Sequence, residues 1–240
     1  MNKNILIMRY QKRFNNLTEY NAYKESEDFI LPNISVCDNE LKVCYTNISK
    51  HEYVDLGLPS GTLWATENIK DANGNYLYFA WGETQGYTSG QVGTNKNFSW
   101  EDYEFGTYNN LSKYNSTDGK TVLEPEDDAA TANWDSNWKM PTKEQFIELI
   151  DYTNKTWEQV DGVEGILFTS VANGNTLFFP AFGYAGNGEV YEDGKYGYYW
   201  SVFLGEDIVS NALALDLDSN DCSLHHEGRS YGYSVRPVRS

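Results

Sequence analysis

The sequence predicts an α+β fold in which antiparallel strands outnumber helices, and three observations favour this class. Short runs of β-branched and aromatic residues alternate with turns rich in Gly, Asn and Asp over most of the 240 residues. Few segments have the 3.6-residue apolar period of a helix. Aromatic residues make up 15% of the chain, so it has enough large apolar side chains to build a core.

Charge divides the chain into two parts. Residues 1–50 contain seven basic and six acidic residues, and residues 51–240 contain 18 − 7 = 11 basic and 35 − 6 = 29 acidic ones, so the net charges are +1 and −18. We place a domain boundary at this change in composition. An acidic chain is not expected to bind nucleic acid, because the phosphate backbone requires a basic surface.

The N-terminal module, residues 1–50, predicts one helix followed by one hairpin. Thr18 can cap a helix that continues through Glu25, and Pro32 ends it. Residues 33–37 and 41–45 alternate like two strands around a short turn. A module of this size has a marginal core, so we expect it to attach to partner chains.

The larger domain, residues 51–240, predicts two helices among many strands. Thr142 and Gln145 form a capping box, and Phe146 and Leu149 share one face. A weaker helix signal begins at Pro125, with three acids in its first turn. Strands are expected at residues 53–56, 62–66, 166–170, 176–180, 198–201, 212–217 and 233–238, and a long loop at 84–118.

Nothing in the sequence predicts membrane insertion or export. No apolar run approaches the roughly 20 residues of a membrane span. The first ten residues lack the apolar stretch of a secretory signal peptide. Three cysteines (Cys37, Cys44 and Cys222) cannot form a disulfide framework. We therefore expect synthesis in a reducing compartment.

Six segments of the larger domain, read together, resemble a known family. They are YVDLGLPSGTLWAT (53–66), YFAWGET (78–84), DDAA (127–130), WKMPT (138–142), YWS (199–201) and SVRPV (234–238). This set is similar to the "major paralogous domain" family of gut-type bacteria and their phages, whose fold is C-type-lectin-like. The resemblance implies a twisted antiparallel sheet with one or two helices, paired terminal strands and long loops that carry recognition.

The resemblance also implies binding rather than catalysis. Some family members are targets of diversity-generating retroelements, which vary surface residues in the last part of the domain. Residues 14–47 are similar to the leading segments of phage fibre and decoration proteins. Together these resemblances predict a virion-attached adhesin or decoration protein that binds a glycan or protein on a host or environmental surface.

The expected partners follow from this hypothesis. Residues 1–50 would contact other virion proteins, and we expect a homo-oligomer, with a trimer as the specific expectation. Two alternatives remain open from the sequence. One is a purely structural virion component without a receptor, and the other is a bacterial surface or secreted binding protein.

The ligand-binding surface is predicted within residues 203–231. The leucines of 213–217 alternate and should face the core, so Asp216 and Asp218 should face away from it. The residues that follow have no apolar period and carry side chains that adaptable binding surfaces favour, although an ordinary polar loop has the same composition. The predicted ligand-binding residues are Phe203, Glu206, Asp207, Asp221, Ser223, His225, His226, Glu227 and Tyr231.

The largest aromatic residues are assigned to the framework. Tryptophan and tyrosine are usually well buried, with their polar atoms bonded. Trp64, Trp81, Trp134 and Trp138 are expected in the core rather than as platforms for sugars, and Tyr199, Trp200 and Arg236 are expected to support the fold.

Catalysis and metal binding have candidate residues but are not predicted. Cys222 is close in sequence to His225 and His226, which does not establish a Cys–His pair. Adjacent histidines on a strand would point to opposite faces. The acidic residues Glu124, Glu126, Asp127 and Asp128 could offer oxygen ligands to Ca²⁺, or could form a solvated helix N-terminus. We expect no enzyme and no cofactor, with calcium as the one candidate.

Overall fold

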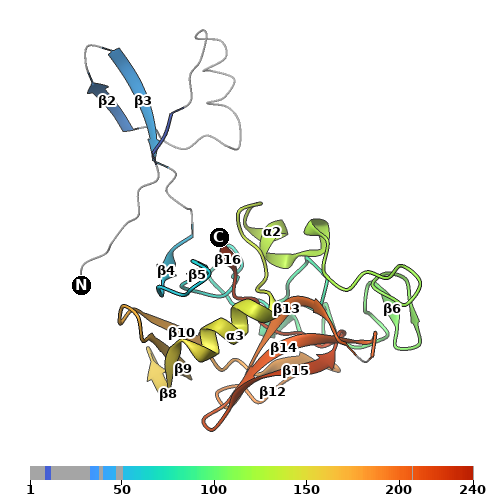
Figure 1. Ribbon diagram of the computed structural model, residues 1–240. Coiled ribbons are helices and arrows are strands. Elements are labelled where there is room, and N and C mark those ends of the chain that lie inside the picture. The colour runs from blue at the N-terminus through green and yellow to red at the C-terminus, as the bar shows by residue number, and fades with distance from the viewer. Residues whose placement is uncertain (1–8, 12–32, 38–39, 47–50, 207, 240) are drawn as a thin grey trace. The chain divides into compact units, whose positions relative to one another are not determined.

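The computed structural model describes residues 9–11, 33–37, 40–46, 51–206 and 208–239 (Figure 1). The chain divides into two compact units, Met1–His51 and Glu52–Ser240. Within the described ranges, antiparallel sheets dominate and two α-helices occur. The predicted α+β class is confirmed at this level.

The first unit contains a three-stranded antiparallel sheet. Strands β2 (Asn33–Cys37) and β3 (Glu40–Thr46) pair with one another, which confirms the predicted hairpin. Strand β1 (Arg9–Gln11) pairs with the other edge of β3. The sequence did not predict β1, because three residues are too few to show a period. The helix predicted within 18–32 lies outside the described residues.

The two ends of the second unit meet in one sheet. Strands β4 (Tyr53–Asp55) and β5 (Leu63–Ala65) form the predicted hairpin, and the C-terminal strand β16 (Val238–Arg239) pairs with β5. The strand predicted at 233–238 is wrong in its extent. Most of that segment makes isolated bridges, such as the one to Phe79, because it passes between segments of the core instead of along a sheet.

Helix α3 (Lys143–Asp151) begins where the sequence predicts. The Thr142 hydroxyl accepts the backbone N–H of Gln145, and the Gln145 side chain accepts the backbone N–H of Thr142. These two bonds satisfy backbone donors that the first turn leaves without a helical partner. Phe146 and Leu149 are fully buried on one face, as expected.

The second helix begins later than predicted. Residues Pro125–Asp127 form a 3-10 turn, η2, and helix α2 spans Ala129–Asn133. Asp128 lies between them, and its carboxylate accepts the backbone N–H groups of Ala130 and Thr131. It is therefore the N-cap of α2, rather than part of a first turn that begins at Pro125.

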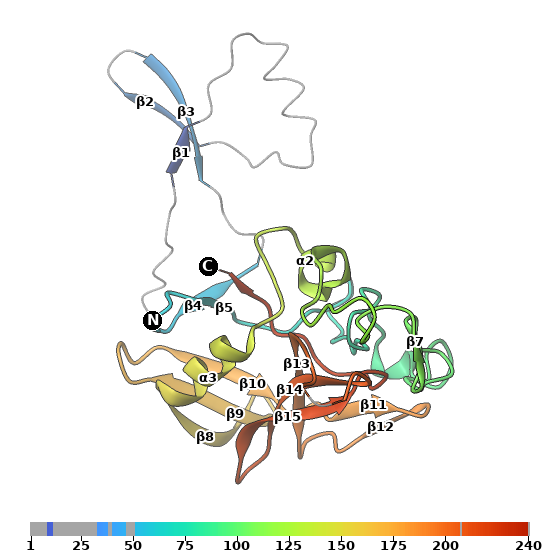
Figure 2. The ribbon, with the colours of Figure 1, turned by 45° about the vertical axis from the view of Figure 1, so that its right-hand side comes forward.

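The chain after α3 forms mostly antiparallel strands. Their bounds are β8 Thr153–Val160, β9 Val163–Ser170, β10 Thr176–Pro180, β11 Tyr184–Gly186, β12 Glu189–Tyr191, β13 Gly197–Leu204, β14 Asn211–Leu217 and β15 Cys222–Gly228. Strand β9 is central between β8 and β10, β14 is central between β13 and β15, and β11 pairs with β12. The β11–β12 hairpin lies beside β15 (Figure 2).

Strand β15 was not predicted. Residues 219–231 were expected to form no regular element, since they lack an apolar period. All seven residues of Cys222–Gly228 instead pair with β14, from Leu217 opposite Cys222 to Asn211 opposite Gly228. Pairing with a buried neighbouring strand thus outweighs the polar composition of the segment.

Residues 84–118 form the predicted long irregular segment. It contains only the 3-10 turn η1 (Ser89–Gln91) and the short strands β6 (Gly106–Thr107) and β7 (Asn110–Leu111). A buried ion pair stabilises the start of this segment, and in it the Lys96 ammonium lies 2.8 Å from the Glu83 carboxylate. Buried polar groups need such partners to offset their desolvation.

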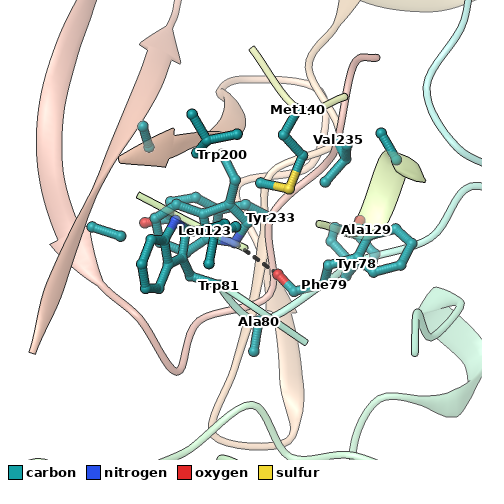
Figure 3. Packing of buried hydrophobic residues seen from close by; sticks show 14 of the residues in the cluster. Tyr78, Phe79, Ala80, Trp81, Leu123, Ala129, Met140, Trp200, Tyr233 and Val235 are labelled. Carbon is teal, nitrogen blue, oxygen red and sulfur yellow. Dashed lines mark hydrogen bonds between the residues drawn. The ribbon is translucent and has the colours of Figure 1, made fainter. Parts of the chain in front are cut away.

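The sheet β13–β14–β15 lies between two hydrophobic clusters. Leu215 belongs to the cluster that contains Phe146 of α3, and the preceding residue, Ala214, belongs to the other. Figure 3 shows the second cluster, where the Trp200 indole N–H donates to the Phe79 carbonyl oxygen at 2.7 Å. The predicted buried framework is confirmed for Trp64, Trp81, Trp138, Tyr199, Trp200, Leu213, Leu215, Leu217 and Arg236, while Trp134 is partly buried.

The capping box of α3 gives a direct test of this part of the fold. We expect Thr142→Ala to lower the free energy of unfolding by about 1 kcal/mol, because it leaves a helix N-terminal donor without its partner. The matched control is Thr117→Ala, since Thr117 is an exposed loop residue. Urea unfolding followed by circular dichroism measures both. Equal stability of the two variants would contradict the role assigned to the cap.

Candidate functional site

One face of β15 brings three predicted ligand-binding residues together. Side chains alternate along a strand, so Ser223 and His225 point to the same side, and Asp221 precedes them there. The Ser223 hydroxyl donates to the Asp221 carboxylate at 2.6 Å and lies 2.9 Å from Nε2 of His225. These three polar side chains form one exposed hydrogen-bonded row.

A group of tyrosines continues this side of the sheet. Six tyrosines and three carboxylates lie within contact or electrostatic range of one another, and we call them the tyrosine face. Its members are Tyr184, Tyr191, Tyr196, Tyr198, Tyr231, Tyr233, Glu192, Asp216 and Glu227. All the tyrosines except Tyr233 are half-buried, so the face combines fixed rings with access to solvent.

Tyr184 is the centre of this face. Its ring centroid lies 5.3 Å from that of Tyr191, 5.3 Å from that of Tyr198 and 5.5 Å from that of Tyr231. Three elements therefore meet here, since these rings come from the β11–β12 hairpin, from β13 and from the segment after β15. Tyr191 stacks on Tyr184, while Tyr198 and Tyr231 meet it edge to face, and contacts of both kinds favour defined ring orientations.

Hydrogen bonds tie two of the rings to carboxylates. The Tyr198 hydroxyl donates to Glu192 at 2.7 Å, and the Tyr233 hydroxyl donates to Glu227 at 3.2 Å. Burial raises the pKa of both tyrosines above the ordinary range. Burial also raises the pKa of Glu227. The phenols consequently remain neutral donors at any physiological pH.

Asp216 points away from the leucines of β14, as predicted. It is half-buried beneath the tyrosine face, opposite Tyr198 on β13 and Ser223 on β15. Burial, followed by repulsion from Glu227, raises the pKa of the Asp216 carboxyl to about 8. Its Oδ1 atom is buried and has no hydrogen-bond partner.

The other predicted residues are spread over several surroundings. Phe203, in β13, packs against a hydrophobic cluster, and Glu206 forms an exposed ion pair with Lys143. Asp207 lies outside the described residues. His226 lies on the side of β15 opposite His225, together with Cys222. Tyr231 and Glu227 belong to the tyrosine face.

Sequence reasoning missed the tyrosines that precede β14. Tyr184, Tyr191, Tyr196 and Tyr198 lie within a 15-residue stretch, and this density of tyrosine was the available signal. Their meeting with Tyr231 depends on the pairing of β13, β14 and β15, which no local pattern encodes.

A buried arginine supports the end of β15. Arg229 is fully buried, and its guanidinium donates to the Tyr103 hydroxyl and to the carbonyl oxygens of Lys113, Tyr114 and Val209, at 2.9–3.1 Å. Arg229 therefore connects the segment 103–114 and the turn before β14 to the end of β15. Strand β15 carries Ser223 and His225 of the polar row.

The arrangement does not form a nucleophile with an oriented base. In a Ser–His–Asp triad the imidazole lies between the other two groups, whereas here the Ser223 hydroxyl lies between Asp221 and His225. Burial raises the pKa of the Cys222 thiol to about 12, so it is not a thiolate at neutral pH. Cys222 also points away from His225.

The acidic side chains near η2 already bond to Lys and backbone N–H groups of the same chain. The Lys113 ammonium bonds to Asp127 and lies 2.9 Å from Glu124. Asp128 accepts backbone N–H groups as the cap of α2, including the N–H of Met140 at 2.9 Å. Within the described ranges, no group of three or more His, Cys, Asp or Glu side chains could hold a metal ion.

A groove of about 630 Å³ has Val190 of β12 in its lining. Rings of Tyr76 and Phe182, whose centroids are 4.3 Å apart, form part of its wall. Because side chains alternate along a strand, Tyr191 points away from the side of β12 that lines the groove. No residue of the tyrosine face lines this groove.

No helix in the described part of the chain is both long and apolar enough to cross a membrane. Comparisons with models of protein families, with curated proteins and with solved structures found no match.

We expect Asp216→Asn to stabilise the protein increasingly as pH rises. The carboxyl has a pKa of about 8 when folded and about 4 in an unfolded chain. Between these values the unfolded state releases a proton that the folded state keeps, so the unchanged protein loses stability as pH rises through this interval. One pKa unit corresponds to about 1.4 kcal/mol. After allowance for partial solvation, D216N should gain about 2–4 kcal/mol relative to the unchanged protein between pH 5 and pH 9.

Urea unfolding at the two pH values measures this difference. The matched control is Asp221→Asn on the same side of the sheet, because the hydrogen bond from Ser223 lowers the pKa of Asp221. That variant should show no gain at high pH. Identical pH dependence for D216N and the unchanged protein would contradict the assigned burial of Asp216.

Proposed function

We propose that the unit Glu52–Ser240 is a recognition domain with a C-type-lectin-like arrangement, which binds a glycan or a protein through the tyrosine face and the adjoining polar row of β15. The observation that carries this proposal is the meeting of six tyrosines with hydrogen-bonding carboxylates on one side of a sheet. The resemblance of the six sequence segments supports the fold within this proposal, as does the pairing of β16 with β5.

The physical basis is the rigidity of the surface. Tyrosine offers a large amphipathic contact area with only two rotatable side-chain bonds, so ordering it on binding costs little entropy. Here the rings already contact one another, and several lie on paired strands. Ser223, His225 and Asp221 add polar groups that can exchange hydrogen bonds with a ligand. Such a surface suits recognition better than covalent chemistry.

The setting we propose is a phage particle, to which residues 1–50 attach the recognition domain. This proposal is supported by the similarity of residues 14–47 to the leading segments of fibre and decoration proteins. Mass spectrometry of purified particles tests it, and absence of the chain from the particles would contradict it. Presence on particles without any ligand binding would favour the structural alternative.

Binding experiments with variants of the face test the recognition function. The fluorescently labelled full chain is applied to a glycan array and to intact bacterial cells, and a bound target is then titrated. We expect Tyr231→Ala to weaken binding by about tenfold, as for a central aromatic contact. Asp221→Ala and His225→Ala should weaken it less.

The matched control is Tyr152→Ala. Tyr152 is an exposed tyrosine that follows α3, on the side of the sheet opposite the tyrosine face, so this variant should bind like the unchanged chain. Binding that survives all three changes on the face would place the ligand elsewhere. Failure of the chain to bind any glycan or cell would contradict the recognition function itself.

A further inference from the structure

Many aromatic rings of the second unit form cation–π contacts with Lys or Arg side chains of the same chain. The Arg229 guanidinium lies 4.8 Å from the ring centroid of Trp81, and that of Arg236 lies 4.4 Å from Phe179. The negative face of an aromatic ring attracts a cation, which explains these contacts. Further pairs are Lys70 with Tyr76, Lys96 with Phe98, Lys113 with Tyr114, and Arg239 with Tyr53 and Trp138.

The tyrosine face is an exception to this feature. Among the residues that the structure describes, no Lys or Arg lies over any of its six rings. In the same part of the chain, neither Glu192, Asp216 nor Glu227 forms an ion pair with Lys or Arg. The tyrosine face thus has carboxylates but no cation.

The carboxylates of the face also lack sufficient donors. Glu227 and Glu192 each accept one tyrosine hydroxyl, whereas Oδ1 of Asp216 is buried without a partner. The charges of Glu227, Asp221 and Glu192 disfavour ionisation of Asp216. A positive charge placed among these carboxylates would offset this repulsion.

We propose that the tyrosine face binds an organic ammonium group of its ligand, with the rings around Tyr184 contacting the cation and the carboxylates of Glu227 and Glu192 neutralising it. This inference rests on the proposed function and names the chemical class that the face selects. An alkylated ammonium group combines a positive charge with an apolar surface, so it matches rings and carboxylates together. A metal ion does not, because the described side chains contain no set of ligands for one.

The test uses a pair of small molecules with the same shape. Choline and its uncharged counterpart 3,3-dimethylbutan-1-ol are titrated into the full chain at low salt, with amide and tyrosine ring signals followed by nuclear magnetic resonance. We expect choline to shift the signals of Tyr184, Tyr198 and Tyr233, and to bind about tenfold more tightly than the alcohol. A third titration with Nα-acetyl-lysine methylamide compares a primary ammonium with a quaternary one and identifies the preferred source.

Variants separate charge from ring contacts. Glu227→Gln and Glu192→Gln keep the shape of the face and should each weaken choline binding by about fivefold. Tyr184→Phe should retain binding, whereas Tyr184→Leu should lose most of it, because leucine has no aromatic face. The first two variants keep the test valid if the leucine variant fails to fold.

The outcomes distinguish this inference from the proposed function. Equal binding of choline and the alcohol, or no shift with either ammonium compound, would overturn the ammonium site. If binding to a glycan or cell still depended on Tyr231 in that case, the recognition function would stand. If choline bound as expected and no surface target were found, the recognition function would fail while the ammonium site remained.

Discussion

The buried guanidinium of Arg229 is the interaction on which the second unit most depends. A cation without solvent is costly unless its donors are satisfied, and here the partners are three carbonyl oxygens, a tyrosine hydroxyl and the surrounding aromatic rings. Those partners come from the segment 103–114 and from Val209, while Arg229 itself follows the last residue of β15. The backbone carbonyl of Arg229 also accepts the N–H of Trp81. One side chain therefore connects the long irregular segment, the turn before β14 and the core.

This connection explains how an irregular domain can carry a defined surface. On one side of β14, its leucines pack with Phe146 of α3. On the other side, Ala214 belongs to the cluster that contains Trp200. On this second side, Asp216 follows Ala212 and Ala214 in the alternation of β14, and it belongs to the tyrosine face. This side of the sheet thus combines a packed core with a partly exposed aromatic and polar surface. We infer that the face is rigid because its rings and strands belong to this packed sheet.

Local signals in the sequence predict only part of this arrangement. The capping box at Thr142, the alternation of leucines in β14 and the hairpin of β4 and β5 depend on near neighbours, and each is confirmed. The strand β15 and the partial burial of Asp216 depend on pairing between distant segments, so neither was predicted, and composition indicated a polar loop in place of β15. The polar row of Asp221, Ser223 and His225 falls within the predicted binding segment, whereas the tyrosines of β11 to β13 were missed. Their pattern indicates strands, but it cannot indicate which strands meet.

Amide hydrogen exchange of an Arg229 variant tests the central claim most directly. Arg229→Lys keeps the positive charge but cannot reach all four acceptors, because an ammonium has three donors and no planar fork. We predict that exchange in this variant accelerates at residues 103–114 and at the amides of Tyr231 and Tyr233, while the amides of β8 to β10 exchange as in the unchanged protein. Unaltered exchange at 103–114 would contradict the account, since it would show that the long segment and the tyrosine face keep their order without Arg229.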